Sequence, residues 1–399
     1  MTATPGLLQL YAARAARGIG DGFAAILLPA YLIEIGLTPF QIGLIATAAL
    51  LGSALLTLTM GTVARRLNFR TLLLGCALLM MMTGLAVPNV QNVGLIALVA
   101  FIGTINPTTG EIGIHVPLEQ AALAERAAAA NRTRVFAGYS LTGALSTAAG
   151  ALSAALPDLL ASGGMSRLAA LQLMFYGYAG LGLLAACFYA RLAPDSVQHE
   201  ATPRTALGPS RGKVYKLAAL FSLDSFAGGL TAQSLMALWL FERFDLSLTA
   251  ASAFFFWSNV LAALSYPAAA RLGQRFGLIN TMVFTHIPAS ICLIAAALSP
   301  QLSTALTLLL VRSALSQMDV PTRTSYVMAV VTPGERAAAA SVTAVPRSLA
   351  SALSPTLSGA LISAASLASP LIICGVLKIA YDVALLFSFR HIKPPEEMT

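Results

Sequence analysis

Long apolar stretches, separated by short polar breaks, run along most of this 399-residue chain. A helix needs about 20 mostly apolar residues to cross about 30 Å of hydrocarbon. Stretches of that length recur here between clusters of polar residues, proline and glycine. The pattern predicts twelve membrane-spanning helices, six on each side of a polar segment, near residues 8–35, 38–64, 69–88, 91–120, 130–157, 166–192, 214–243, 246–272, 278–298, 301–331, 335–364 and 368–391.

The composition agrees with a chain that lies in a bilayer. Hydrophobic residues make up 57% of it and charged residues only 10%, whereas a soluble chain is about 25% charged. A soluble domain must spread charge over its exterior, so a soluble enzyme, a nucleic-acid reader and a disordered scaffold are all excluded. We therefore expect an all-α membrane protein.

The polar segment 193–213 divides the predicted helices into two bundles, residues 1–192 and 214–399. Lys and Arg concentrate in this segment and in alternate loops, which by the positive-inside rule face the cytoplasm. We therefore expect a cytoplasmic linker, both termini in the cytoplasm and a multi-pass location in the inner (plasma) membrane. The net charge of +8 then orients the chain and requires no nucleic acid.

Short landmarks of the first half recur in the second in the same order, which indicates a duplication. The run Glu125–Ala130 returns as Glu335–Ala340, 210 residues later. The other paired landmarks are Asp21-Gly22-Phe23 with Asp224-Ser225-Phe226, Asn106-Pro107-Thr108 with Val320-Pro321-Thr322, and Gly150-Ala151-Leu152 with Gly359-Ala360-Leu361.

Two six-helix bundles of parallel topology joined by a linker are typical of the major facilitator superfamily, which the chain resembles along its whole length. The loop after the second helix matches part of the family signature Gly-x-x-x-Asp-Arg-x-Gly-Arg-Arg through Gly61, Arg66 and Arg70, with Arg65 in place of the acid. Arg275 occupies the corresponding loop of the second half. The resemblance implies that these four matching residues take part in conformational gating. The alternative is that the arginines only orient the chain.

Ionisable residues within the predicted spans are candidates for function, because charges at bilayer depth cost several kcal/mol. In the family, the first, fourth, seventh and tenth helices line the central cavity. The resemblance therefore implies that seven of the nine candidates face that cavity, whereas the last two lie on the peripheral twelfth helix: Asp21, Glu111, His115, Asp224, Arg312, Asp319, Arg323, Lys378 and Asp382.

Four of the carboxylates are our proton-coupling candidates: Asp21, Asp224, Glu111 and Asp319. Burial disfavours the charged form of a carboxyl group and so favours proton uptake. The alternatives are structural ion pairs, namely Asp21 with Arg17 one turn away and Asp319 with Arg323. For Lys378 and Asp382, also four residues apart, the structural pair is the favoured interpretation.

Candidate substrate-binding residues combine cations with aromatic rings, which suit an organic solute. They are Arg312, Arg323, Tyr31, Tyr139, Phe226 and Trp257. The aromatic side chains equally suit helix packing. The four cysteines all lie within apolar helices at unrelated spacings, so we expect no disulfide framework and no metal site. His286 with Met282 is interpreted as packing.

The chain contains no motif typical of a catalytic triad, a P-loop or another ATP site. We therefore expect a monomeric secondary transporter with no cofactor and no enzymatic activity, which works by alternating access. Proton-coupled efflux of a small organic solute or drug is the leading prediction. Proton-coupled uptake of a small organic anion is the alternative, and a non-transporting membrane sensor is a third.

Overall fold

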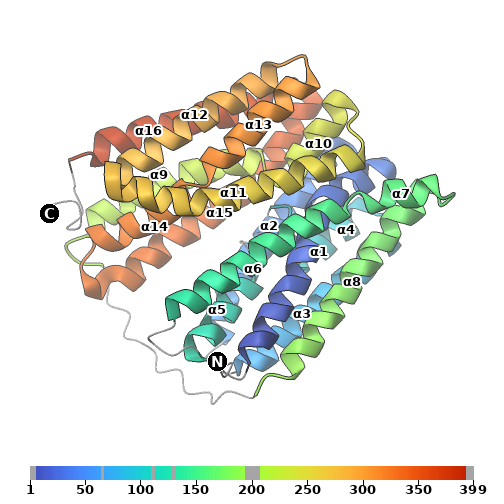
Figure 1. Cartoon of the computed structure of the whole chain (residues 1–399), viewed down its shortest axis with the longest axis horizontal. Helices are drawn as coiled ribbons and strands as arrows, with labels where there is room; N and C mark the ends of the chain where they lie inside the picture. Colours follow the sequence, from blue (N-terminus) through green and yellow to red (C-terminus); the bar gives the residue numbers. More distant parts are fainter. Residues whose placement is uncertain (1–5, 64–66, 109–112, 127–131, 194–206, 392–399) are drawn as a thin grey trace. The chain divides into compact units, whose positions relative to one another are not determined.

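A computed structural model describes residues 6–63, 67–108, 113–126, 132–193 and 207–391 of the chain (Figure 1). Within these residues the regular structure is entirely helical, which confirms the predicted all-α membrane fold. Eight of the described helices are long and apolar enough to cross a membrane. Two shorter apolar helices, Val93–Ile102 and Leu302–Ser316, lie where the fourth and tenth spans are predicted.

The helices follow one another in the order in which the apolar stretches occur along the chain. Two one-turn 3-10 helices, Val87–Asn89 and Pro333–Glu335, complete the described structure. The α-helices are α1 (Leu7–Glu34), α2 (Pro39–Val63), α3 (Phe69–Ala86), α4 (Val93–Ile102), α5 (His115–Arg126), α6 (Arg132–Ser153), α7 (Leu156–Ser162), α8 (Arg167–Ala190), α9 (Arg211–Leu230), α10 (Gln233–Phe244), α11 (Leu248–Phe276), α12 (Leu278–Leu298), α13 (Leu302–Ser316), α14 (Asp319–Val330), α15 (Arg336–Ala364) and α16 (Ser369–Phe389).

Three of the predicted spans are built from two helices each, so the count of twelve unbroken helices is not met. The fourth span is divided into α4 and α5, the seventh into α9 and α10, and the tenth into α13 and α14. The first break contains Pro107, and Pro321 lies in the first turn of α14, where a missing backbone N–H costs least. Discontinuous helices expose backbone polar groups at depth, which is tolerated where they face a cavity or a polar site.

The first compact unit of the structure comprises Met1–His199 and Ala232–Phe256. It differs from the bundle predicted from the sequence by including α10 and the first turns of α11. The reason is packing, because α10 contacts α1 and α2. The Ser234 N–H at the start of α10 also donates to the Pro107 carbonyl in the break of the fourth span, at 2.9 Å.

Within this unit α1 is the central helix and packs against both α6 and α8 (Figure 1). Close approach of α1 and α6 relies on small residues, since a side chain on Gly150 would collide with the Ile19 backbone. Similarly, a methyl group on Gly84 of α3 would lie 2.7 Å from the Phe175 carbonyl of α8. The consequence is a tightly buried α1, which carries the charged residues described below.

The second compact unit comprises Glu200–Thr231 and Trp257–Thr399. Here α9 packs against α15 and α16, and α12 packs against α13, α14 and α16. The Ser358 hydroxyl of α15 donates to the Leu230 carbonyl at the end of α9, at 2.8 Å. Buried apolar residues of α9, α12, α14, α15 and α16 form the core of this unit.

Candidate functional site

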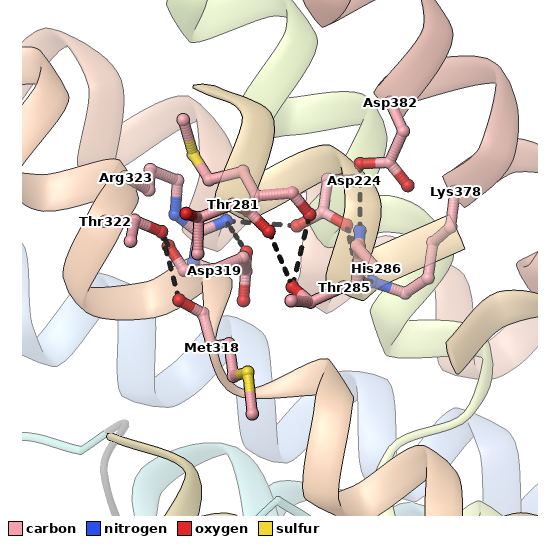
Figure 2. Close-up of polar contacts among 11 residues, drawn as sticks. Asp224, Thr281, Thr285, His286, Met318, Asp319, Thr322, Arg323, Lys378 and Asp382 are labelled. Atoms are coloured by element: carbon pink, nitrogen blue, oxygen red, sulfur yellow. Dashed lines mark hydrogen bonds and ion pairs between the residues drawn. The ribbon is translucent and has the colours of Figure 1, made fainter. Parts of the chain in front are cut away.

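Asp224 on α9 lies at the centre of a buried charge cluster in the second unit (Figure 2). Its Oδ2 accepts from Arg323 Nη1 of α14 at 3.0 Å, and its Oδ1 accepts from Lys378 Nζ of α16 at 2.6 Å. Arg323 also pairs with Asp319 at 3.2 Å, one turn earlier on α14. Charge-assisted bonds of this kind are about twice as strong as neutral ones, so Asp224 is held from two sides.

His286 on α12 continues the cluster away from Asp224. Its Nδ1 lies 3.1 Å from Asp382 Oδ1, and its Nε2 lies 3.3 Å from Lys378 Nζ. His286 and Asp382 are both almost wholly buried, and the Asp382 Oδ2 has no hydrogen-bond partner among the described residues. Buried charges are tolerated where they are paired, and we refer to Asp224, His286, Asp319, Arg323, Lys378 and Asp382 as the Asp224 cluster.

The cluster changes two of the interpretations made from spacing alone. The Asp319–Arg323 contact is present, as the spacing of four residues predicts. Lys378 and Asp382 do not pair with each other among the described contacts, because Lys378 reaches Asp224 and Asp382 holds His286. His286, interpreted as packing, instead connects these residues.

Two further cations of the second unit stand outside these ion pairs. Neither Arg312 on α13 nor Arg347 on α15 has a hydrogen bond or an ion pair within the part of the chain that the structure describes. Arg347 lies within electrostatic range of Arg323, Asp224 and Asp319. The second unit therefore holds two half-buried arginines that none of its described carboxylates pairs with.

A second polar cluster, in the first unit, is centred on Glu119 of α5. Its carboxylate is fully buried and accepts hydrogen bonds from Arg17 of α1, from Tyr189 of α8 and, at 2.5 Å, from Tyr139 of α6. Arg14, one turn before Arg17, lies over the Tyr139 ring at 5.3 Å. Arg17 is thus bound to Glu119 rather than to Asp21, the partner considered from the sequence.

Asp21 lies in a small polar cavity of the first unit, beside the break between α4 and α5. The cavity encloses about 20 Å³, which is enough for about one water molecule. Among the described residues, no hydrogen bond or ion pair engages the Asp21 carboxylate. His115, at the start of α5, also lines the cavity, and its buried Nε2 has no partner among the described residues. The full lining is Arg17, Asp21, Ser53, Leu56, Gly103, Thr104, Asn106, Gly113, Ile114, His115 and Val116.

The aromatic candidates are dispersed rather than gathered around one site. Tyr31 is buried, packs edge-on against Phe175 and donates to the Val87 carbonyl at 3.3 Å. Tyr139 belongs to the Glu119 cluster, and Phe226 on α9 is half-buried. Trp257 on α11 is 55% exposed, so it faces away from the interior of its unit.

Of the gating candidates, only Arg70 and Arg275 have described side chains. Arg70 is half-buried at the start of α3, and Arg275 lies over the Phe276 ring at 5.2 Å near the end of α11. Gly61 lies in the last turn of α2, whereas Arg66 and Glu111, one of the proton-coupling candidates, lie outside the described residues.

Glu335, between α14 and α15 and outside the membrane-spanning helices, binds the start of α9. Its carboxylate accepts the Gly208 N–H at 2.5 Å, the Ser210 N–H at 3.4 Å and the Thr332 hydroxyl at 2.6 Å. The hydrogen bonds from Ser210, Thr332 and Gly208 lower the pKa of Glu335 to about 2. This carboxylate anchors the segment that leads into α9, whose N-cap residue Ser210 makes no side-chain capping bond.

The roles of two residues central to these clusters were not identified from the sequence. Glu119 lies near the end of a predicted span and was not singled out, although its spacing of four from His115 places both on one helix face. His286 has no charged neighbour within a turn of its own helix. Its partners come from α9 and α16, so no local signal could have revealed its role.

The helices, the buried charges and the breaks at depth define a multi-pass membrane transporter. A family model described as Major Facilitator Superfamily matches residues 10–311 and 217–399. The chain therefore belongs to the major facilitator superfamily, as its motifs suggested.

Individual relatives agree with the family and are distant in sequence. The uncharacterized membrane protein YJR124C of Saccharomyces cerevisiae is 24% identical over 420 residues, which cover 95% of this chain and 93% of that protein. Among solved structures, a point mutant of the nucleoside transporter NupG matches with a TM-score of 0.78 and 14% identity, over 96% of this chain and 100% of that one. A bacterial homologue of the human lysosomal transporter Spinster matches with a TM-score of 0.73 and 17% identity, over 96% and 94%. At such identities the structures support the fold alone.

Proposed function

We propose that this chain is a proton-coupled secondary transporter of a small organic solute, and that it works by alternating access. The family supports secondary transport. Coupling to protons rests on the Asp21 carboxylate, which lies in a polar cavity with no ion-pair partner among the described residues. A carboxylate in such a place can exchange its proton without first breaking an ion pair.

Asp21 and Asp224 are repeat-related but differ in what binding a proton would require. Asp224 contacts both Arg323 and Lys378, so a proton there must displace two cations. Asp21 has electrostatic interactions with Arg17, whose guanidinium is bound to Glu119. We therefore assign the first proton-binding role to Asp21, and Asp319 and Glu111 follow as further candidates.

Efflux, with proton entry exchanged for solute exit, remains the leading direction. In that mechanism proton binding at Asp21 and solute binding alternate during the transport cycle. One observation favours the alternative, proton-coupled uptake of an organic anion. Arg312 and Arg347 of the second unit have no ion-pair partner among the described residues, and such cations suit an anionic group.

The test uses purified protein in proteoliposomes that contain a pH-sensitive dye. A thermal-shift screen of small organic solutes supplies the substrate, which is then added under an imposed pH gradient. Proton movement against the solute indicates efflux by exchange, and proton movement with the solute indicates uptake. The Asp21→Asn variant should bind the solute yet move no protons.

The matched control is Asp245→Asn, because Asp245 is an exposed residue with a left-handed backbone that asparagine also adopts. This variant should transport like the wild type. If Asp21→Asn accumulates solute against a gradient with normal proton movement, the assignment to Asp21 is wrong.

We further propose that the chain is a monomer of the inner membrane with both termini in the cytoplasm, and that Gly61, Arg66, Arg70 and Arg275 act in gating. The distribution of Lys and Arg supports the orientation. Reporter domains fused separately to each terminus test it, since both should report the cytoplasm.

A further inference from the structure

We propose that His286 and Lys378 compete for one oxygen of Asp224, so that a proton bound by His286 releases the Lys378 ammonium to bind an anionic group of the substrate. The proposal rests on the proton coupling proposed above. It gives a role to α12 and α16, which carry the two competing side chains (Figure 2). It also supports the alternative given above, proton-coupled uptake of a small organic anion, over efflux.

The hydrogen bonds of His286 fix which nitrogen carries its proton. A lysine ammonium has only donors, and Lys378 is kept charged by Asp224 at 2.6 Å. His286 Nε2, 3.3 Å from Lys378 Nζ, must therefore accept, so it carries no hydrogen. The proton of the neutral ring then lies on Nδ1, from which it is donated to Asp382 Oδ1 at 3.1 Å.

A second proton on the ring can bind only at Nε2, and there it conflicts with Lys378. Two donors and two positive charges would then face each other at 3.3 Å, which is repulsive. The same Nε2 already lies 3.9 Å from Asp224 Oδ1, the oxygen that Lys378 occupies. A small shift lets the imidazolium donate to that oxygen in place of Lys378. Asp224 then remains paired with a cation, while Lys378 is free.

Other charged groups surround His286 without occupying Nε2. On the helices that pack against α12, the titratable and charged residues are Cys374, Lys378, Tyr381 and Asp382 of α16, Asp319, Arg323 and Tyr326 of α14, and Arg312 of α13. Asp224 of α9 also lies 3.9 Å from His286 Nε2. Asp382 stabilises the imidazolium through Nδ1, and Arg323 stays on the other oxygen of Asp224. Only the contact with Lys378 becomes unfavourable on proton binding.

A second cation, Arg312, lies on α13, which packs against the helix that carries His286. Arg312 has no ion pair among the described residues, so Lys378 would join it as a second donor for a carboxylate or another anionic group. Proton binding and anion binding then favour each other, which is the requirement for moving both together.

The test measures the accessibility of Lys378 in the full-length purified protein. Reductive methylation with formaldehyde is followed at Lys378 by mass spectrometry between about pH 8 and pH 5.5, a range that spans the usual histidine titration. Lys213 is exposed and serves as the internal reference, because the ratio of the two labelling rates cancels the pH dependence of the reagent. If a proton at Nε2 displaces Lys378 from Asp224, the ratio should rise roughly tenfold toward low pH.

His286→Gln removes the proton-binding group, while the glutamine amide oxygen can still accept from Lys378. The ratio of Lys378 to Lys213 labelling in this variant should therefore not change with pH. His391→Gln is the matched control, because His391 is exposed at the end of α16, and its ratio should follow the wild type. A flat ratio in the wild type, or a pH-dependent ratio in folded His286→Gln, overturns the proposal.

A second measurement needs no substitution. The chain has four histidines, so nitrogen NMR of histidine-labelled protein can assign each ring. At high pH His286 should be protonated at Nδ1 alone, and at low pH at both nitrogens as the labelling ratio rises. Protonation of Nε2 alone at high pH contradicts the proposal. Both readouts are independent of transport, so a failure of solute movement in proteoliposomes would count against the proposed function and not against this switch.

Discussion

Replacing Glu119 with alanine should destabilise the first unit strongly, because it leaves a buried guanidinium without its carboxylate. Glu119 is the ion-pair partner of Arg17, and both side chains are almost fully buried. Removing one partner of a buried ion pair costs about 3–5 kcal/mol. Tyr139 and Tyr189 would also lose the acceptor of their hydroxyl groups.

The expected loss of Tm in Glu119→Ala can be compared with that in Tyr139→Phe, a smaller change in the same cluster. At about 2–4 °C of Tm for each kcal/mol in a unit of this size, Glu119→Ala should lower the Tm by about 6–20 °C. Tyr139→Phe removes one hydrogen bond to a charged group, about 1.5–3 kcal/mol, and should lower it by less. The assay is thermal unfolding in detergent, followed by static light scattering and tryptophan fluorescence.

A double variant separates the ion pair from simple loss of volume. When Arg17→Met is combined with Glu119→Met, the buried charge and its partner disappear together, and apolar replacements of buried pairs are often near neutral. The double variant should recover at least about half of the loss. If Glu119→Ala unfolds at the wild-type temperature, or the double variant is less stable than Glu119→Ala, then the unpaired Arg17 is not the cause of the loss.

Two further substitutions test contacts described above. Gly84→Ala should destabilise the protein by about 1–3 kcal/mol, because the added methyl group meets the Phe175 carbonyl at 2.7 Å. In the control Gly75→Ala, on the same helix, the added methyl group has no atom within 4 Å, so this variant should be neutral or slightly stabilising. Thermal unfolding of both variants checks this. Glu335→Gln should lower the Tm near neutral pH, because it removes a carboxylate that accepts a hydrogen bond from Gly208. That carboxylate contributes stability above its usual pKa of 4.5, and the contribution disappears as the pH falls toward about 2. The Tm difference between wild type and Glu335→Gln should therefore shrink below about pH 4.5, and a difference that does not change with pH would contradict the role assigned to this carboxylate.

The fold could be predicted from the sequence because its main determinants are local. Apolar length predicts where spans lie, and the relation of Asp21 to Asp224 exposes the duplication without any knowledge of packing. The breaks in three spans are less predictable. Pro107 and Pro321 indicate a disturbance, but the ends of α4 and α14 depend on which backbone groups find partners in the folded unit.

The candidate site was predictable in kind but not in its connections. The rule that buried charges are functional identified Asp224, Arg323 and Lys378 individually. Their pairing could not be derived, because Lys378 reaches Asp224 from 154 residues away and the helical spacing favours Asp382 as its partner. Sequence spacing reports neighbours on one helix, whereas the Asp224 cluster is assembled across several.

The membership of α10 in the first unit bears on how the chain folds as it is synthesised. Folding during synthesis generally begins with the N-terminal part, yet Ala232–Phe256 belongs to the first unit and emerges only after α9 of the second. The surfaces of α1 and α2 that α10 covers therefore stay uncovered until the ribosome has passed the linker. A gene cut within the linker would yield a first fragment that lacks this cover and can complete its structure only when the other fragment is made beside it.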